Sequence, residues 1–239
     1  MTEPPHHDRT GTGPVLLLLP GGAGHPMGLG PLTERLAARF TVVTYDPLGL
    51  AHGRLGLPVP EQRVADWSEG AHRLLEAVLP EGEQAYVCGT SSGGIAALDL
   101  LARHPERLAH VVAHEPACVA ALPDGAERRA ELIAQLDGAE RPPAEGAEAT
   151  PFGVFLARVL HPFTAYVPVR AAPPGRLTVA AGSDSRGQVL HRTAGFLAER
   201  LGGGFAEFPG GHLGTVDHPA EFADRLTGVL LGASACTSA

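Results

Sequence analysis

Residues 88–94 read Cys88-Gly89-Thr90-Ser91-Ser92-Gly93-Gly94, after the apolar run 85–87 and before the helical stretch 95–103. This is a Gly-x-Ser-x-Gly motif in its setting of strand, sharp turn and helix. A serine at the apex of such a turn has a strained backbone, and side chains two positions away would collide where strand and helix meet. The motif predicts that Ser91 is a nucleophile. A frame centred on Ser92 fits less well, because Thr90 then takes a glycine position.

A serine needs a general base to become a nucleophile near neutral pH, and the chain offers 12 histidines for that role. His212 stands apart because it lies in Pro209-Gly210-Gly211-His212, directly after the last expected strand. A histidine flanked by glycines in that loop can reach over the edge of the sheet. The chain order of nucleophile, acid and histidine also favours His212 as the base.

Three carboxylates could orient His212. Asp184 follows the fifth expected strand, 28 residues before His212, and is our first choice, although it could equally cap the next helix. Glu115 follows the fourth expected strand and is the alternative acid. Asp217 is close to His212 in sequence but suits a cap for the final helix. The sequence leaves the choice open.

The loop after the first expected strand reads Pro20-Gly21-Gly22-Ala23-Gly24-His25 and predicts one side of an oxyanion hole. Its backbone N–H groups, on Gly22 or Ala23, would act together with the N–H of Ser92. The loop lacks the Gly-x-Gly-x-x-Gly spacing of a dinucleotide site, so we expect no cofactor.

Two further histidines, His25 and His52, lie in loops at the carboxyl ends of expected strands and are candidates to line a substrate pocket. His110 and His114 share a face of one strand, but no third ligand is evident, and we expect no metal. The three cysteines are far apart in sequence and suggest neither a disulfide framework nor a zinc site.

The chain has 239 residues, 44% of them hydrophobic, which suits one large domain or one domain with an insertion. Its net charge of −8 argues against nucleic acid or an anionic membrane surface as a partner. No apolar run approaches the roughly 18–20 residues that cross a bilayer, and Met1–Gly13 shows no signal peptide. We therefore expect a cytoplasmic protein. All 18 basic residues are arginine, which excludes a catalytic lysine and is typical of a high-GC genome.

Short apolar runs alternate with helical patterns, which predicts an α/β fold with a mostly parallel sheet of about six strands covered on both faces. The expected strands are Val15–Leu19, Thr41–Tyr45, Gln84–Cys88, Leu108–Ala113, Leu177–Ala181 and Phe205–Phe208. The expected helices are Pro31–Arg39, Val64–Leu79, Gly93–His104, Gly187–Leu201 and Pro219–Leu231.

About sixty residues, Glu115–Gly175, interrupt this alternation and contain two amphipathic segments, Ala126–Leu136 and Pro151–His161. A simple crossover does not need that length. We interpret residues 115–175 as a lid or cap, and residues 1–114 and 176–239 as the core domain. The other reading of the insertion is a peripheral excursion.

With these motifs, the span Pro14–Leu231 resembles the α/β-hydrolase superfamily, and more narrowly the compact single-domain hydrolases common in actinomycetes. The resemblance implies an α/β-hydrolase fold with a small helical cap, a Ser91–Asp184–His212 triad and an oxyanion hole at the first loop. Members usually begin with an antiparallel hairpin, for which Met1–Gly13 is too short and polar, so the sheet is expected to be trimmed.

The leading functional hypothesis is a serine hydrolase that cleaves a small ester, lactone or thioester through an acyl-enzyme. A second is a non-hydrolytic reaction on the same scaffold, such as a cyclase, lyase or C–C bond reaction in secondary metabolism. A third is a non-catalytic ligand-binding module, which the joint presence of Ser91, His212 and a nearby acid disfavours. The expected partner is a small-molecule acyl substrate.

Overall fold

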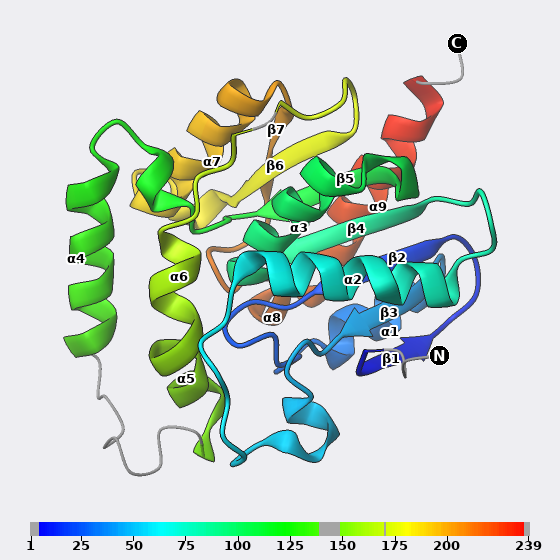
Figure 1. The fold of residues 1–239 in the computed structure, drawn as a ribbon. Coiled ribbons are helices and arrows are strands. Elements are labelled where there is room, and N and C mark those ends of the chain that lie inside the picture. Colours follow the sequence, from blue (N-terminus) through cyan, green and yellow to red (C-terminus); the bar gives the residue numbers. More distant parts are fainter. Residues whose placement is uncertain (1–4, 139–148, 170, 237–239) are drawn as a thin grey trace.

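The computed structural model describes residues 5–138, 149–169 and 171–236. A seven-stranded sheet in the order β1-β3-β2-β4-β5-β6-β7 forms its centre (Figure 1). All neighbouring strands are parallel except β1, which pairs antiparallel with β3. The strands are β1 His7–Thr10, β2 Val15–Leu19, β3 Thr41–Tyr45, β4 Ala85–Thr90, β5 Leu108–His114, β6 Leu177–Gly182 and β7 Gly204–Phe208. The predicted α/β-hydrolase fold is confirmed, with one strand more than expected.

Strand β1 corrects the expectation that the amino-terminal arm adds nothing to the sheet. His7–Thr10 pairs residue by residue with Tyr45–Val42. The strand is polar and largely exposed, so it carries no hydrophobic run that periodicity could detect. Backbone hydrogen bonds to the edge of β3, rather than a buried face, hold it in place.

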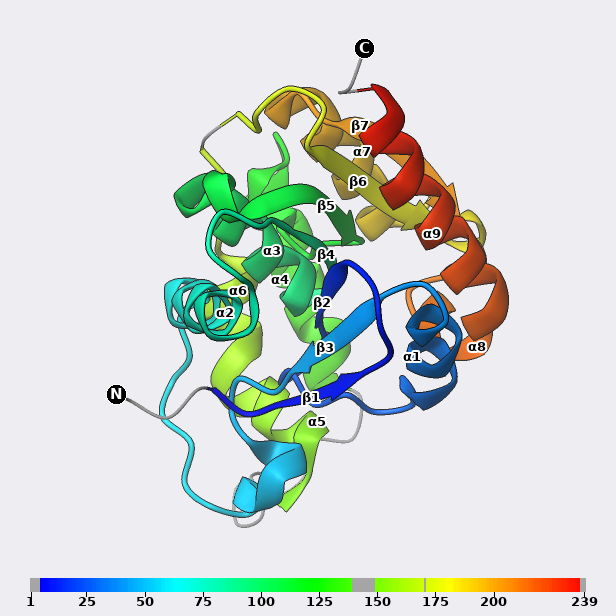
Figure 2. The ribbon, with the colours of Figure 1, turned by 90° about the vertical axis from the view of Figure 1, so that its right-hand side faces the viewer.

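Helices cover both faces of the sheet (Figure 2). Alternate residues of the parallel strands belong to two separate cores: Leu17 and Val87 pack with one, Leu16 and Val112 with the other. Helices α2, α3 and α7 complete the first core, and α1 and α9 the second. The helices are α1 Gly30–Ala37, α2 Val64–Val78, α3 Ser92–Arg103, α4 Gly125–Gly138, α5 Pro151–Val154, α6 Leu160–Thr164, α7 Val189–Leu201, α8 Gly214–Asp217 and α9 Pro219–Cys236.

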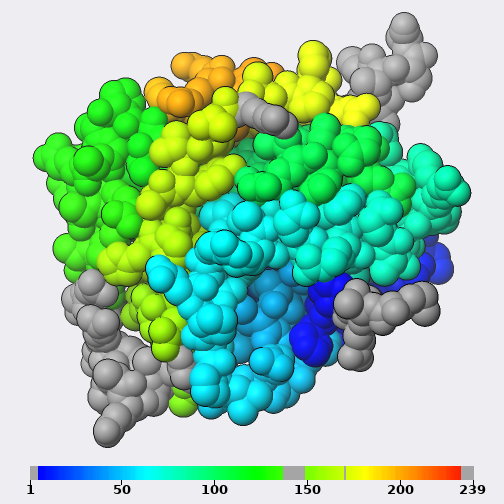
Figure 3. All heavy atoms as spheres, viewed as in Figure 1, coloured from blue at the N-terminus to red at the C-terminus, as the bar shows by residue number. Residues whose placement is uncertain are grey.

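The chain between β5 and β6 leaves the sheet to form α4, α5 and α6, with the turn Phe155–Val159 joining the last two. Helices α5 and α6 follow one another end to end, and α4 lies beside them at one end of the molecule, as green and yellow-green atoms in the space-filling view (Figures 1 and 3). The predicted amphipathic segments fall on α4 and on α5 through α6. Among the described residues, no helix combines the length and the apolarity that a membrane span requires.

Candidate active site

Ser91 lies between the end of β4 at Thr90 and the start of α3 at Ser92. Its backbone has φ +51° and ψ −118°, a conformation that costs a non-glycine residue on the order of 1–3 kcal/mol. The surroundings fix it from both sides: the Ser91 N–H donates to the His114 carbonyl at 3.0 Å, and the Ile95 N–H donates to the Ser91 carbonyl at 3.1 Å. The turn therefore presents Ser91 as a nucleophile elbow does.

Small residues let strand and helix approach at this turn. A Cβ on Gly93 would lie 1.9 Å from the Leu19 carbonyl oxygen, and a Cβ on Gly89 would lie 2.3 Å from the Gly93 carbonyl oxygen. Both contacts are with backbone atoms, which cannot move aside as a flexible side chain can. The glycines of the motif are therefore packing requirements of the turn.

Gly93→Ala is expected to destabilise the protein by about 2 kcal/mol or more, because the added methyl group overlaps the end of β2. Urea unfolding measures the change. Gly195→Ala is the matched control, since that helical glycine has nothing within 4 Å of the added Cβ. The control is expected to be neutral or stabilising by up to about 1 kcal/mol. Equal stability of the two variants would contradict this account of the turn.

His212 lies in the loop after β7, and its Nδ1 is 2.8 Å from Oε2 of Glu115. Glu115 directly follows β5 and is fully buried. Its other oxygen, Oε1, accepts the N–H of Gly182 at 3.0 Å. A buried carboxylate on Nδ1 leaves Nε2 as the free nitrogen and orients the ring, as in a serine–histidine–acid triad.

Asp184, the first choice of acid from the sequence, does not contact His212. The short turn Ser183–Ser185 after β6 directs Asp184 to solvent, where its carboxylate accepts the Ser183 hydroxyl at 3.1 Å. Asp217, at the end of α8, is also exposed. The alternative acid, Glu115, is the one that pairs with His212, and the choice of Asp184 is wrong.

Glu115 has the second unusual backbone of the site, with φ +41°. Among the described residues, Ser91 and Glu115 are the two non-glycine positions with positive φ. The Glu115 N–H donates to the Ala180 carbonyl at 2.8 Å, so the strained residue is tied to β6. Strain at two residues of one site is consistent with a functional constraint on both.

Burial alone would raise the pKa of Glu115, but hydrogen bonds lower it to about 2. The donors are His212, the hydroxyl of Ser185 and the N–H of Gly182. Glu115 is therefore ionised at neutral pH and can stabilise a positive charge on His212. Ser185 is a site residue that sequence reasoning missed, because nothing in its spacing distinguishes it from the other small residues of that turn.

His114, next to Glu115, is completely buried, and neither ring nitrogen has a hydrogen-bond partner in the described part of the chain. It packs edge-on against Phe222, with ring centroids 5.2 Å apart. Burial lowers the pKa of His114 to about 4, although the Glu115 charge acts in the opposite direction. His114 is neutral in the folded protein at neutral pH.

Acid is expected to destabilise the protein partly through His114. As pH falls from about 6.5 towards 4, the unfolded chain binds a proton at this residue while the folded chain does not, so stability is lost. His114→Leu should reduce the loss between pH 7 and pH 5 by on the order of 2 kcal/mol. Urea unfolding at both pH values measures it, with the exposed His161→Leu as control. A wild-type pH dependence in His114→Leu would refute this role.

The first loop reaches Ser91 as the oxyanion hypothesis requires. The Ser92 hydroxyl donates to the Gly22 carbonyl at 2.6 Å, and a Cβ on Gly21 would lie 3.1 Å from that of Ser91. Ser92 is the first residue of α3, where backbone N–H groups have no acceptor within the helix. Gly22, with φ +60°, and Ala23 line the same cavity as Ser91.

A cavity of about 350 Å³ opens beside these residues. Ser91 and His212 both line it, together with side chains from the first loop, α4, α5, α6, α7 and α8. His25 also lines it, and its Nδ1 is buried without a partner among the described residues. The structure therefore places His25 at the cavity, and a contact of His25 with substrate stays a prediction.

His52 lies outside this cavity, contrary to expectation. Its Nδ1 is 2.8 Å from the buried carboxylate of Asp46, which also accepts the N–H groups of Leu50 and Ala51. His6, in the arm before β1, stacks on the same ring at 5.4 Å. The Asp46 turn holds His52 at the carboxyl end of β3, beside the start of β1.

Three other possible ligands come together away from the cavity: His72, His104 and Glu106 offer atoms within 4.8 Å of one another. The two imidazoles stack face to face, with centroids 3.6 Å apart and 3° between their planes. A metal ion cannot lie in the planes of two rings stacked in this way. His104 Nε2 is also 3.2 Å from Glu69. The arrangement is that of packed rings in an ion-pair cluster.

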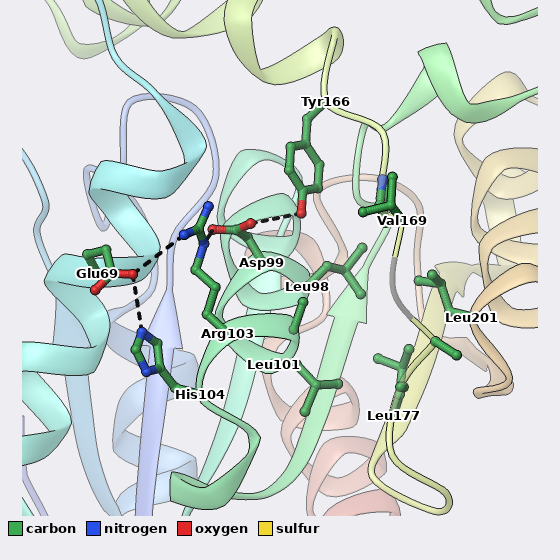
Figure 4. A pocket seen from close by; sticks show the side chains of 14 residues that line it. Glu69, Leu98, Asp99, Leu101, Arg103, His104, Tyr166, Val169, Leu177 and Leu201 are labelled. Carbon is green, nitrogen blue, oxygen red and sulfur yellow. Dashed lines mark hydrogen bonds and ion pairs between the residues drawn. The ribbon is translucent and has the colours of Figure 1, made fainter.

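A second cavity, of about 490 Å³, lies over the carboxyl-terminal half of α3 (Figure 4). At its centre the buried Asp99 accepts Arg103 Nε at 2.6 Å and the Tyr166 hydroxyl at 2.9 Å. The Ser68 hydroxyl also donates to this carboxylate. These polar groups are satisfied by one another, and Ser91 lies at the opposite end of the helix.

Known sequences match most of this chain. The model of the alpha/beta hydrolase family matches residues 16–225. A protein named uncharacterized hydrolase YraK, from Bacillus subtilis, is 32% identical over 94% of this chain and 92% of its own length. A pimeloyl-[acyl-carrier protein] methyl ester esterase from Aromatoleum aromaticum is 40% identical over 41% of this chain and 36% of its own.

Among solved structures, a thermophilic esterase from Thermogutta terrifontis superposes with a TM-score of 0.69 at 16% identity, covering 95% of this chain and 93% of its own. The NocB thioesterase domain from the nocardicin cluster has the same TM-score at 20% identity, covering 95% and 99%. At these identities the structural likeness concerns the fold.

Proposed function

Because this chain belongs to the alpha/beta hydrolase family, we propose that it is a serine hydrolase that cleaves a small ester, lactone or thioester. The observation that carries the proposal is the 2.8 Å contact of His212 with the buried Glu115, beside a cavity that Ser91 also lines. A packing role alone would not require an ionised carboxylate on a histidine that is partly open to the cavity.

In the proposed reaction, His212 Nε2 takes the proton of the Ser91 hydroxyl as its oxygen attacks the substrate carbonyl. The N–H of Ser92, with that of Gly22 or Ala23, stabilises the oxyanion. His212 then returns the proton to the departing alcohol or thiol, and an acyl group stays on Ser91. Water, deprotonated by the same histidine, releases the acid and restores the enzyme.

Glu115 stabilises the imidazolium that forms in both steps, because it is ionised and shielded from water. Residues 115–175 supply Glu115 at their start, and α4, α5 and α6 then line the cavity. We propose that α4, α5 and α6 form a lid that shields the acyl-enzyme. The actinomycete grouping, a place in secondary metabolism and a cytoplasmic location stay predictions from the sequence.

Labelling with a fluorophosphonate probe tests the proposal directly. Intact-mass analysis should show one adduct, which peptide mapping places on Ser91, and Ser183→Ala should keep it. Hydrolysis of an ester in ¹⁸O-labelled water should then place the label in the acid product. Folded protein that takes up no adduct and turns over no ester or thioester would refute the proposal, and product without the label would favour a non-hydrolytic reaction.

A further inference from the structure

Over its described residues, the wall of the cavity beside Ser91 carries no ionic side chain. Charged residues make up 18% of the chain, yet none of the described residues that line this cavity is Asp, Glu or Arg. Its titratable groups are His25 and His212. A substrate with a second carboxylate or a phosphate would have to lose its hydration here without gaining a permanent cation, which is unfavourable.

Apolar side chains from the lid and the core form most of the wall. Leu132 of α4, Phe152 of α5 and Phe163 of α6 line it from the lid. Ile95 of α3 and Leu190 of α7 line it from the core. Burial of apolar substrate surface against these groups is therefore the main binding energy that the cavity can supply.

The volume sets the size of the group that the cavity can enclose. If each heavy atom takes about the 30 Å³ of a water molecule, then 350 Å³ holds on the order of ten to twelve heavy atoms. The ester group uses some of them. An acyl chain of about six to ten carbons fills the remaining space.

The apolar surface continues to the outside of the molecule. Four side chains of the cavity wall are also exposed large hydrophobic residues: Met27 (56%), Phe152 (42%), Leu213 (59%) and Val216 (41%). Clustered exposed apolar groups mark binding sites more often than isolated ones do. The route from solvent to Ser91 therefore also favours a neutral, apolar molecule.

We propose that the substrate of the Ser91 site has a neutral, apolar acyl group of about six to ten carbons. The inference rests on the proposed function, because the acyl part is the part that stays bonded to Ser91 while the alcohol leaves. The described wall offers no cation to an acid with a charged end, such as a monoester of a dicarboxylic acid, so we expect such esters to be poor substrates. Short acyl groups are accepted but leave most of the cavity empty.

A series of p-nitrophenyl esters tests chain length and charge with one leaving group. The expected kcat/KM rises about fourfold per methylene from acetate to an optimum near octanoate, and falls again by the dodecanoate. The p-nitrophenyl monoester of octanedioic acid should be at least about 100-fold poorer than the octanoate. Equal rates for acetate and octanoate, or for the neutral and carboxylated eight-carbon esters, would overturn the proposal.

A cavity-filling variant tests whether these walls set the preference. Leu132→Trp should lower kcat/KM for the octanoate at least tenfold more than for the butyrate, because the indole shortens the cavity. Ile133→Trp is the matched control, since Ile133 follows Leu132 on α4, is equally half-buried and does not line the cavity. An equal loss of activity on the octanoate in both variants, or no loss in either, would show that Leu132 does not set the preference for chain length.

Binding to Ser91→Ala separates failure of this inference from failure of the proposed reaction. Titration calorimetry should show methyl octanoate binding at least tenfold more tightly than the monomethyl ester of octanedioic acid. If wild-type protein hydrolyses no ester but this preference holds, the reaction is wrong and the substrate class stands. If the fluorophosphonate labels Ser91 and the preference is absent, the reaction stands and the substrate class is wrong.

Discussion

Replacement of Ser91 by alanine is expected to lower kcat for any accepted ester by at least about 10⁴-fold, because the proposed acyl-enzyme forms on its hydroxyl. The fluorophosphonate adduct should disappear with it. Kinetics on the octanoate ester, with protein of verified purity, measure the loss. This is the largest effect that we expect from a single change in the chain.

The fold should survive this change. Alanine keeps the Cβ, and the backbone bonds at this turn, from Ser91 N–H to the His114 carbonyl and from Ile95 N–H to the Ser91 carbonyl, do not involve the hydroxyl. The melting temperature of Ser91→Ala should therefore stay within about 3 °C of wild type. A variant that keeps its fold and more than about 1% of the activity would show that Ser91 is not the nucleophile.

Glu115→Gln is expected to lower kcat by about 10²–10⁴-fold while the protein remains folded. The amide can still accept the Gly182 N–H, but it has lost the negative charge that stabilises a protonated His212. If the NH₂ group of the new amide donates to Nδ1 of His212, the ring hydrogen moves to Nε2. Nε2 is the nitrogen that must be free for His212 to act as the base. The pH profile of kcat/KM should shift together with the rate.

Asp184→Asn is the matched control, because it makes the same chemical change at the acid that the sequence favoured. Its carboxylate is exposed and bonds to Ser183, so its activity should stay within about twofold of wild type. If Asp184→Asn lost more activity than Glu115→Gln, the pairing of Glu115 with His212 would not be the working arrangement. Circular dichroism of both variants checks that the comparison is between folded proteins.

Much of the fold could be predicted from the sequence, because the patterns that mark its strands are local. The parallel strands are mostly apolar, so their positions follow from short hydrophobic runs, and all six expected strands are present. Strand β1 was not predicted, because a short edge strand is held by backbone hydrogen bonds, which any polar sequence can make. Its partner, the edge of β3, exists only once the sheet is assembled.

The site, like the fold, could be predicted only in part from the sequence. The sequence alone determined the position of Ser91, because the glycines around it are needed where strand and helix touch, and it indicated His212 by its place after the last strand. Only the tertiary structure decided that Glu115, and not Asp184, lies on His212. Both carboxylates follow neighbouring strands, so spacing cannot separate them. The backbone of Glu115, with φ +41° and an N–H bonded to Ala180, turns its side chain to His212, while the turn after β6 turns Asp184 to water.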